Sequence, residues 1–240
     1  MKYVLALTIF SSVQAQAVEL PPNAIKYLPA VTTQAKSYWP EFPPKYLAGQ
    51  IEQESCISLK HKKCWNPRAE LKTSREVGFG VGQITIAYNA DGSERFNVFK
   101  ELKKQDSVLS NWKYEDRYNP DYQIRALMVK DKMEFNRIKW DAPSVEKYAF
   151  MFAAYNGGSG SITQDRKLCT VEKKCNNKLW FNNVELYSFK SKIKAKGYGK
   201  SFFEINREYP KLIIFERSAK YGAWLRKQGG ISVDDIESPK

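Results

Sequence analysis

The chain of 240 residues lacks a long apolar segment, an internal repeat and a low-complexity tract. A membrane-spanning helix needs about 20 consecutive apolar residues, and the apolar stretch from Val4 to Phe10 is much shorter. Repeat proteins show self-similarity at a fixed period, which this chain does not. Because the chain has none of these features, its length suits one domain with short additions at its ends.

The first residues have the features of a secretory signal peptide. Lys2 provides a basic start, the apolar stretch follows it, and Ala15-Gln16-Ala17 places small residues at the spacing of a cleavage site. We therefore predict a signal peptide over residues 1–17 and export to the periplasm or the extracellular space, with no transmembrane anchor after cleavage. A buried first helix and an uncleaved anchor are the alternatives.

Cysteine and histidine are scarce, with four cysteines and one histidine. No cysteine pair has the C-x-x-C spacing of many zinc sites, although His61 lies between Cys56 and Cys64. An even number of cysteines in an exported chain favours disulfides, and local pairing is the simplest of the three connectivities. We expect the bridges Cys56–Cys64 and Cys169–Cys175, each worth about 2–3 kcal/mol, with zinc as the competing interpretation.

Acidic residues are outnumbered, at 26 Asp and Glu against 39 Lys and Arg, so the formal net charge is +13. A surplus of this size indicates an anionic partner, either nucleic acid, a lipid surface or a cell-wall polymer. No nucleic-acid-binding module is recognisable, and an exported protein does not meet nucleic acid. Peptidoglycan and its attached acidic polymers fit the predicted location, and a solvated basic surface without a specific partner is the alternative.

The N-terminal part is rich in proline. Residues 18–44 hold six prolines and predict an irregular segment with one helix over 23–38, interrupted near Pro29. Residues 45–54 then have helical spacing, which places Glu54 on or beside an apolar stripe at the last turn.

Helical periodicity dominates the following residues, so we predict an α+β fold in which helices outweigh strands. Residues 56–79 are polar and indicate a loop, while glycines alternating with apolar residues at 78–82 indicate a short strand or a hairpin turn. The expected helices are 94–104, 122–138, 144–155 with Ser144 as its N-cap and Gly157-Gly158 as its stop, and 202–227 with a kink or break at Pro210.

Two segments show no clear periodicity. Residues 159–200 are basic and polar and contain the second cysteine pair, which indicates an insertion with little regular structure. Residues 228–240 indicate an exposed C-terminal tail. The chain therefore divides into the signal peptide, the proline-rich segment over 18–44, one domain over 45–227 and the tail.

Three short motifs carry groups that suit the cleavage of a sugar polymer. Glu54-Ser55 lies at a helix end, Gln83 lies in the Gly-Val-Gly-Gln-Ile-Thr sequence of residues 80–85, and Tyr155-Asn156 lies in Ala-Tyr-Asn-Gly-Gly. A carboxylic acid, an amide on a tight turn and a Tyr-Asn-Gly turn can together enclose one acid that cleaves a glycosidic bond.

In this order the motifs resemble those of the soluble lytic transglycosylase family. The likeness covers roughly residues 45–221, with 159–200 as an insertion. In its last part, Tyr209 resembles the active-site tyrosine of the family's closing helix. The chain departs from the family's pattern at Cys56, at Gly82, where a bulky residue is usual, and at Pro210. Further matches are Pro67, Ala69, Ser74, residues 119–124, Ile213 and Tyr221.

The resemblance implies a lysozyme-like α+β catalytic domain that cleaves the MurNAc-β-1,4-GlcNAc bond of peptidoglycan without a metal or a cofactor. In this family one glutamate, matched by Glu54, protonates the glycosidic oxygen and then deprotonates the muramyl 6-hydroxyl, so the product is a 1,6-anhydro sugar. Desolvation at the end of the apolar stripe is expected to raise the pKa of Glu54.

The remaining motif residues have supporting roles in this interpretation. Ser55 either orients the Glu54 carboxylate or caps the helix, and Gln83 contacts the substrate's N-acetyl group or the developing charge, or is a polar turn residue. Tyr155 and Asn156 line the groove, and Tyr209 either hydrogen-bonds Glu54 or packs in the core.

Two other functions remain open. If Glu52 or Asp91 stood opposite Glu54 with room for water, inverting hydrolysis by a muramidase of the goose-type lysozyme kind would be favoured. The third possibility is a non-catalytic glycan-binding or assembly protein on the same fold. Wall remodelling, a secretion or conjugation apparatus, and phage entry or lysis are the expected settings.

Overall fold

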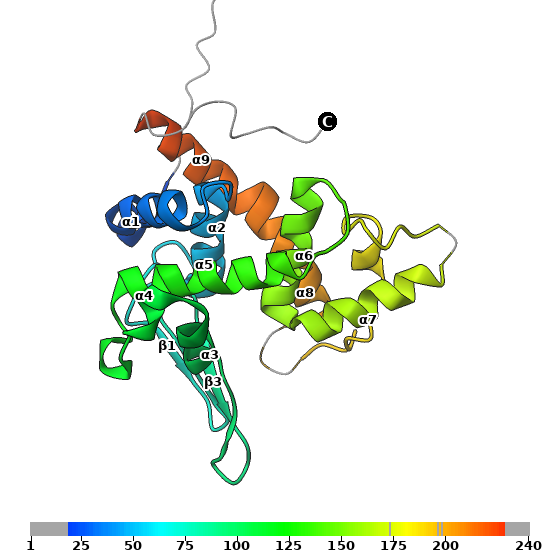
Figure 1. Ribbon diagram of the computed structural model, residues 1–240, viewed down its shortest axis with the longest axis horizontal. Coiled ribbons are helices and arrows are strands. Elements are labelled where there is room, and N and C mark those ends of the chain that lie inside the picture. The colour runs from blue at the N-terminus through cyan, green and yellow to red at the C-terminus, as the bar shows by residue number, and fades with distance from the viewer. Residues whose placement is uncertain (1–18, 173, 196, 198, 229–240) are drawn as a thin grey trace, which may run out of the picture.

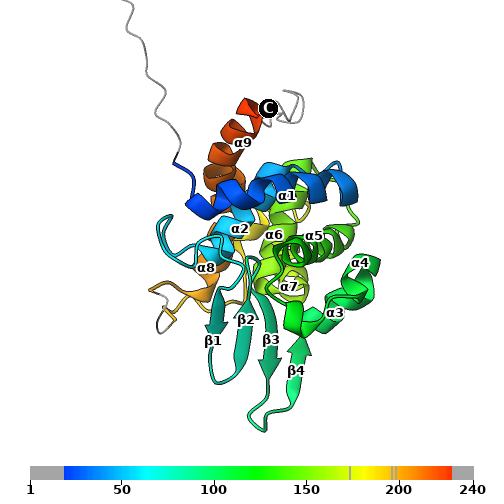
Figure 2. The same cartoon turned by 90° about the vertical axis from the view of Figure 1, so that its left-hand side faces the viewer.

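Helices form the larger part of the protein, and a small antiparallel sheet extends from them (Figures 1 and 2). The computed structural model describes residues 19–172, 174–195, 197 and 199–228. The predicted signal peptide and all but the first residue of the predicted tail lie outside the described residues. The α+β class with helices in excess is confirmed.

The elements follow one another in the order helices, sheet, helices. The N-terminal helices are α1 (Pro22–Tyr38) and α2 (Pro44–Ser55), and the strands are β1 (Glu70–Lys72), β2 (Glu76–Phe79), β3 (Ile84–Tyr88) and β4 (Glu94–Asn97). The following elements are α3 (Val98–Gln105), α4 (Ser107–Ser110), η1 (Tyr114–Asp116), α5 (Pro120–Asn136), α6 (Ser144–Gly157), α7 (Ser159–Thr170), η2 (Val184–Leu186), α8 (Phe202–Lys211), the π-helical turn η3 (Leu212–Arg217) and α9 (Ser218–Lys227).

Helix α1 is continuous, so the interruption predicted near Pro29 is wrong. The proline lacks a backbone N–H and cannot bond the carbonyl of Ile25, but Pro29 lies on the exposed face of the helix. Burial of Leu28 and Val31 holds the opposite face against the core. Packing therefore outweighs the loss of one helical hydrogen bond.

The sheet corrects two other predictions. Its strands pair in the order β1-β2-β3-β4, all antiparallel, with Phe79 opposite Ile84 across the β2–β3 turn. Strands β1 and β2 lie within the predicted loop, and β4 occupies the first residues of the helix predicted over 94–104. The strands are short, and packing of Phe79 and Ile84 against the ring of Trp112 in a second core holds them.

Helix α5 lies at the centre of the molecule, between the two cores (Figure 1). Ile124, Leu127 and Met128 face the main core among the helices, whereas Ala126 and Val129 face the second core beneath the sheet. Because α5 is covered on both sides, it joins the sheet to the helical part.

Residues 159–200 have more regular structure and more buried side chains than predicted. They contain α7 and η2, and Ile162, Trp180 and Val184 belong to the main core. The Asp165–Arg207 ion pair, with a 2.7 Å separation and both side chains nearly fully buried, ties this region to α8. The helical periodicity was missed because α7 is short and mostly polar.

The N-cap of helix α6 lies one residue before the predicted N-cap. Pro143 is the N-cap and Ser144 is the first helical residue, without a side-chain capping bond. Glu146 in the first turn instead accepts hydrogen bonds from the backbone N–H groups of Trp180 and Phe181. The helix ends as expected at Gly158, whose φ of 82° suits glycine.

The C-terminal helix does not break at Pro210. This proline lies inside α8, and the wider π-helical turn η3 begins two residues later, at Leu212. Gly49 of α2 faces this turn, and a Cβ on it would lie 3.3 Å from the carbonyl oxygen of Ile213. The missing side chain lets the backbones of α2 and η3 approach closely.

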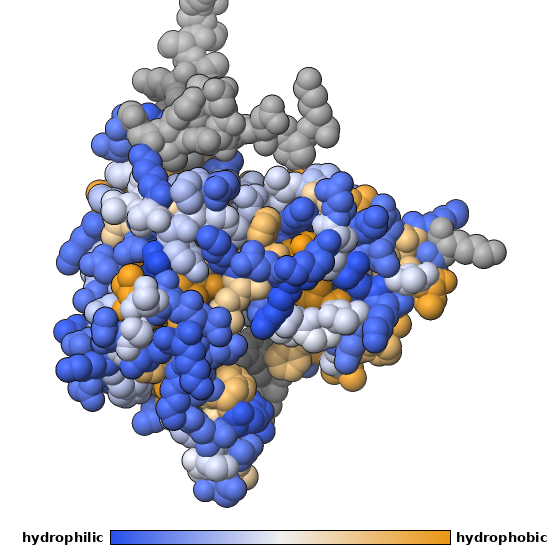
Figure 3. Space-filling view, in the orientation of Figure 1, coloured by the Kyte–Doolittle hydropathy of each residue, from blue (hydrophilic) through white to orange (hydrophobic). Residues whose placement is uncertain are grey.

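Both expected disulfides, Cys56–Cys64 and Cys169–Cys175, are present, so no cysteine thiolate is available to zinc. Among the described residues no helix is long and apolar enough to cross a membrane. The face seen in Figure 3 is largely hydrophilic, with smaller apolar patches, as the basic composition leads one to expect.

Candidate active site

Glu54 lies in the last turn of α2 and is partly buried. Its carboxylate accepts a short hydrogen bond from the hydroxyl of Tyr209, which α8 contributes from the far end of the chain. Burial raises the pKa of Glu54 above the ordinary value of 4.5, while the Tyr209 hydrogen bond and the positive charge of Lys130 act in the opposite direction. The net effect is a raised pKa, so Glu54 keeps its proton to a higher pH than an ordinary glutamate does.

Two parallel tyrosine rings form one wall beside Glu54. The rings of Tyr155 and Tyr209 are 6.3 Å apart between centroids, with an interplanar angle of 8°. The Tyr155 hydroxyl donates to the carbonyl oxygen of Gly82 at 2.7 Å. Burial raises the pKa of both hydroxyls well above the ordinary value, so both are neutral donors at physiological pH.

The β2–β3 turn is fixed in place by α5. Gln123 of α5 accepts from the backbone N–H of Val81 at 3.0 Å and donates to the carbonyl of Pro67 at 2.8 Å. Gly80 has a φ of 76°, and a Cβ on it would lie within 2.6 Å of the Gln123 amide. Only glycine fits here, because both the backbone conformation and the space exclude a side chain.

Gly82 replaces the bulky residue that the family pattern leads one to expect. A Cβ at this position would lie 2.9 Å from a methyl carbon of Leu127 and 3.5 Å from the Tyr155 hydroxyl. The missing side chain therefore lets Leu127 pack closely against the turn.

The side chain of Gln83 closes its own turn. Its amide nitrogen donates to the carbonyl oxygen of Gly80 at 2.8 Å, and its backbone has a φ of 46°. The structure therefore assigns Gln83 a structural hydrogen bond within the turn. A role toward substrate stays a prediction.

Ser55 fastens the loop after α2 instead of orienting the carboxylate of Glu54. Its hydroxyl donates to the carbonyl of Ile51 at 2.6 Å and accepts from the backbone N–H of Trp65 at 2.9 Å. The Cys56–Cys64 disulfide closes the same loop. Ser55 thus positions Glu54 only through the backbone.

Asn156 is exposed and is held by α8. Its side-chain oxygen accepts from the amide nitrogen of Asn206 at 3.0 Å, and that nitrogen also donates to the carbonyl of Ala153. A Cβ on Gly157 would lie 2.6 Å from the same nitrogen and 3.0 Å from the Lys190 side chain. The Tyr-Asn-Gly turn is therefore packed from outside by residues of the 159–200 region and α8.

Sequence reasoning missed a buried polar group on α5. Asp131 is fully buried and accepts from the amide of Gln50 at 3.0 Å, and burial raises the pKa of its carboxyl well above the ordinary value. Lys130 lies with its ammonium 3.6 Å from the centroid of the Tyr155 ring. A signal was available, because Asp131 follows Leu127 by four residues on a predicted apolar stripe.

The two acids considered as a second carboxylate lie elsewhere. Glu52 is fully buried and forms ion pairs with Arg217 at 3.1 Å and Lys220 at 2.6 Å. Asp91 is exposed in the β3–β4 turn, where it accepts hydrogen bonds from Ser93. Neither carboxylate is placed to activate water opposite Glu54.

The site thus combines one partly buried acid, a tyrosine hydroxyl bonded to it, a second tyrosine and a nearby lysine. Such a group can donate a proton and take one back in a region shielded from bulk water. No protein-family model and no curated protein matches this chain. A functional proposal therefore depends on its own residues.

Proposed function

We propose that this protein is an exported peptidoglycan lytic transglycosylase with a lysozyme-like catalytic domain. The observation that carries the proposal is the single acid Glu54, whose pKa is raised by burial and whose carboxylate is hydrogen-bonded by Tyr209. The ordered motifs, the helical fold with a small sheet beside the acid, and the net charge of +13 support it. The two disulfides are in keeping with export.

In the proposed cycle Glu54 protonates the oxygen between MurNAc and GlcNAc, and the bond from the anomeric carbon to that oxygen breaks. The Glu54 carboxylate then removes the proton from the muramyl 6-hydroxyl, and that oxygen bonds to the anomeric carbon. The proton returns to Glu54, and water is not consumed. Hydrogen-bond donation from Tyr209 stabilises the carboxylate between the two steps.

A transfer within the sugar needs no second carboxylate, in contrast to most glycosidases. Glu52 forms ion pairs with two cations, and Asp91 lies on an exposed turn. Asp131 is fully buried and accepts a hydrogen bond from Gln50. These positions favour transglycosylation over hydrolysis.

The test is mass spectrometry of the muropeptides released from purified sacculi by the wild type and by Glu54→Gln. We expect 1,6-anhydro ends from the wild type and a loss of rate of at least about a hundredfold in the variant. Glu216→Gln, at an exposed position of η3, is the matched control. Reducing ends would instead identify a muramidase, and equal rates for Glu54→Gln and wild type would remove Glu54 from catalysis.

A further inference from the structure

The segment between η2 and the first turn of α8 has an unusual composition. Residues 187–203, the basic segment, contain five lysines and no acidic residue. Four of these lysines alternate along the chain from 190 to 196. Lys192 and Lys194 are both exposed, whereas Lys190 is half-buried.

The basic segment is fastened beside the Glu54 site. The Lys190 ammonium donates to the carbonyl oxygen of Gly157 at 3.3 Å and to the hydroxyl of Ser161. Arg207 donates to the carbonyl oxygen of Tyr187 at 2.6 Å, and its neighbour Asn206 bonds to Asn156. The segment is therefore held against the turn that follows Tyr155.

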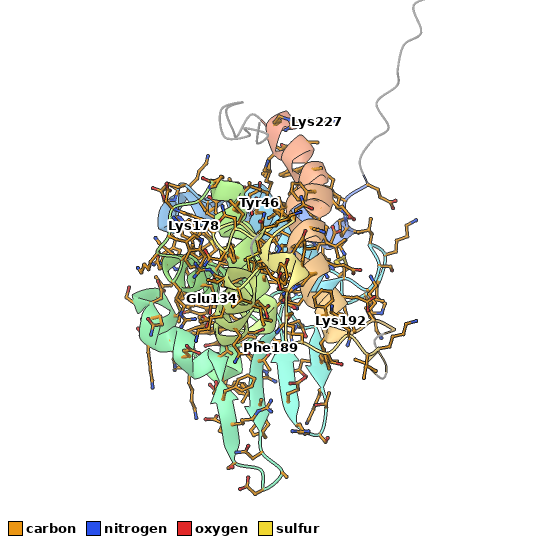
Figure 4. All side chains as sticks on the ribbon, turned by 90° about the vertical axis from the view of Figure 1, so that its right-hand side faces the viewer. Tyr46, Glu134, Lys178, Phe189, Lys192 and Lys227 are labelled. Carbon is orange, nitrogen blue, oxygen red and sulfur yellow. A yellow bond between two sulfur atoms is a disulfide. The ribbon has the colours of Figure 1, made fainter. Side chains whose placement is uncertain are left out.

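Two large apolar side chains of the segment face solvent. Phe189 is 69% exposed and Ile193 is 81% exposed. Figure 4 shows Phe189 and Lys192 at the edge of the helical part from which the strands extend. A solvent-exposed aromatic ring beside a proposed glycan site offers a flat surface for the apolar face of a sugar ring.

The nearby acids are already engaged by other groups. Glu208 pairs with Lys200, Glu185 pairs with Lys211, and Glu204 accepts two hydrogen bonds from Ser201, besides its weaker attraction to Lys194. Lys192 and Lys194 are exposed. Their charges are thus available to a partner that brings carboxylates.

We propose that the basic segment binds the acidic glycan next to the Glu54 site, with Phe189 packed on a sugar ring and Lys192 and Lys194 paired with carboxylates of muramic acid or its peptide stem. This inference rests on the proposed function, since it extends the same substrate beyond the cleaved bond.

Binding is measured with Glu54→Gln protein, so that the ligand is not consumed, on purified sacculi and on the uncharged hexamer of N-acetylglucosamine. Phe189→Ala is expected to weaken both by about twofold to tenfold. Lys192→Gln/Lys194→Gln is expected to weaken only sacculus binding, by about threefold or more at low salt, with the difference lost at roughly 1 M salt.

Matched controls come from α1, which contributes no residue to the site. Ile25→Ala removes a side chain that is 54% exposed, and Lys26→Gln/Lys36→Gln removes two exposed charges. Variants of the basic segment that bind both ligands as their controls do would overturn the inference. Failure of the proposed function is a separate result, namely a wild type that releases no muropeptides from sacculi.

Discussion

At the scale of single residues, the proposed chemistry depends on opposing effects at Glu54. Burial favours the neutral acid, whereas the Tyr209 hydroxyl and the Lys130 charge favour the carboxylate. An acid that must donate a proton and later accept one benefits from this balance, because neither protonation state is too stable. The neutral tyrosine hydroxyl helps in both steps, since it can remain bonded to the oxygen whichever state Glu54 adopts.

Replacing Tyr209 by Phe keeps the ring stacked on Tyr155 and removes only the hydroxyl. The carboxylate of Glu54 then loses a donor, so its pKa rises further, and the protonated acid persists to higher pH. We expect the descending high-pH limb of the pH–rate profile to move upward, with a lower maximum rate. The profile of muropeptide release checks this.

The control for this variant is Tyr114→Phe, which alters a tyrosine on η1 and should leave the limb unchanged. A limb that moves downward in Tyr209→Phe would contradict the assigned direction of the hydrogen bond.

At the scale of elements, the turn between β2 and β3 shows how the sheet and α5 depend on each other. Gln123 bonds to Val81 within the turn and to two carbonyl groups outside it, those of Pro67 and Arg117. The carbonyl oxygen of Gly82 in the same turn accepts a hydrogen bond from the Tyr155 hydroxyl. A disturbance at Gly80 is therefore expected to reach the site through the backbone.

Alanine substitutions at two glycines distinguish the cost of backbone strain from the cost of a steric clash. Gly92→Ala places a side chain at a φ of 82° in open space, and Gly80→Ala places one at a φ of 76° against Gln123. We expect the free energy of unfolding to fall by about 1 kcal/mol in Gly92→Ala and by about 3 kcal/mol or more in Gly80→Ala. Urea denaturation measures both, and equal losses would show that the Gln123 contact is unimportant.

At the scale of the whole molecule, the first and last thirds of the chain meet at a buried anion. Glu52 of α2 binds Arg217, Lys220 and the hydroxyl of Tyr221, and that hydroxyl accepts from the indole of Trp65. Glu52 is two residues from Glu54, so the C-terminal helices hold the segment that carries the acid. Cys169, Trp180 and Val184 of the 159–200 region likewise belong to the main core.

Glu52→Gln removes the charge from this cluster and leaves the two cations without a carboxylate. We expect a loss of about 3 kcal/mol in the free energy of unfolding, with the rate of sugar cleavage per folded molecule unchanged. Thermal denaturation and muropeptide release measure the two quantities. A folded Glu52→Gln protein with the activity loss of Glu54→Gln would make Glu52 a second catalytic carboxylate.

Much of the local structure could be predicted because it follows from local patterns. Helix α2 ends within one residue of its predicted boundary, and α5 has the predicted buried residues Ile124, Leu127 and Met128. Short strands could not be found in the same way, since β1 and β4 carry little alternation and depend on contacts with distant residues. The bond from Tyr209 to Glu54 was one of two expected possibilities, and only the packing of α8 selected it.

The sequence by itself predicted the helical character, the two disulfides and an acid in a motif that resembles one of the lytic transglycosylases. These depend on periodicity, on close cysteines and on residue identity, all of which are local. Tertiary structure alone decided that Ser55 fastens a loop, that Gln50 donates a hydrogen bond to Asp131, and that Ile162, Trp180 and Val184 of the 159–200 region belong to the core. Those outcomes arise from contacts between segments far apart in the chain, where burial and charge are set by neighbours that no local pattern contains.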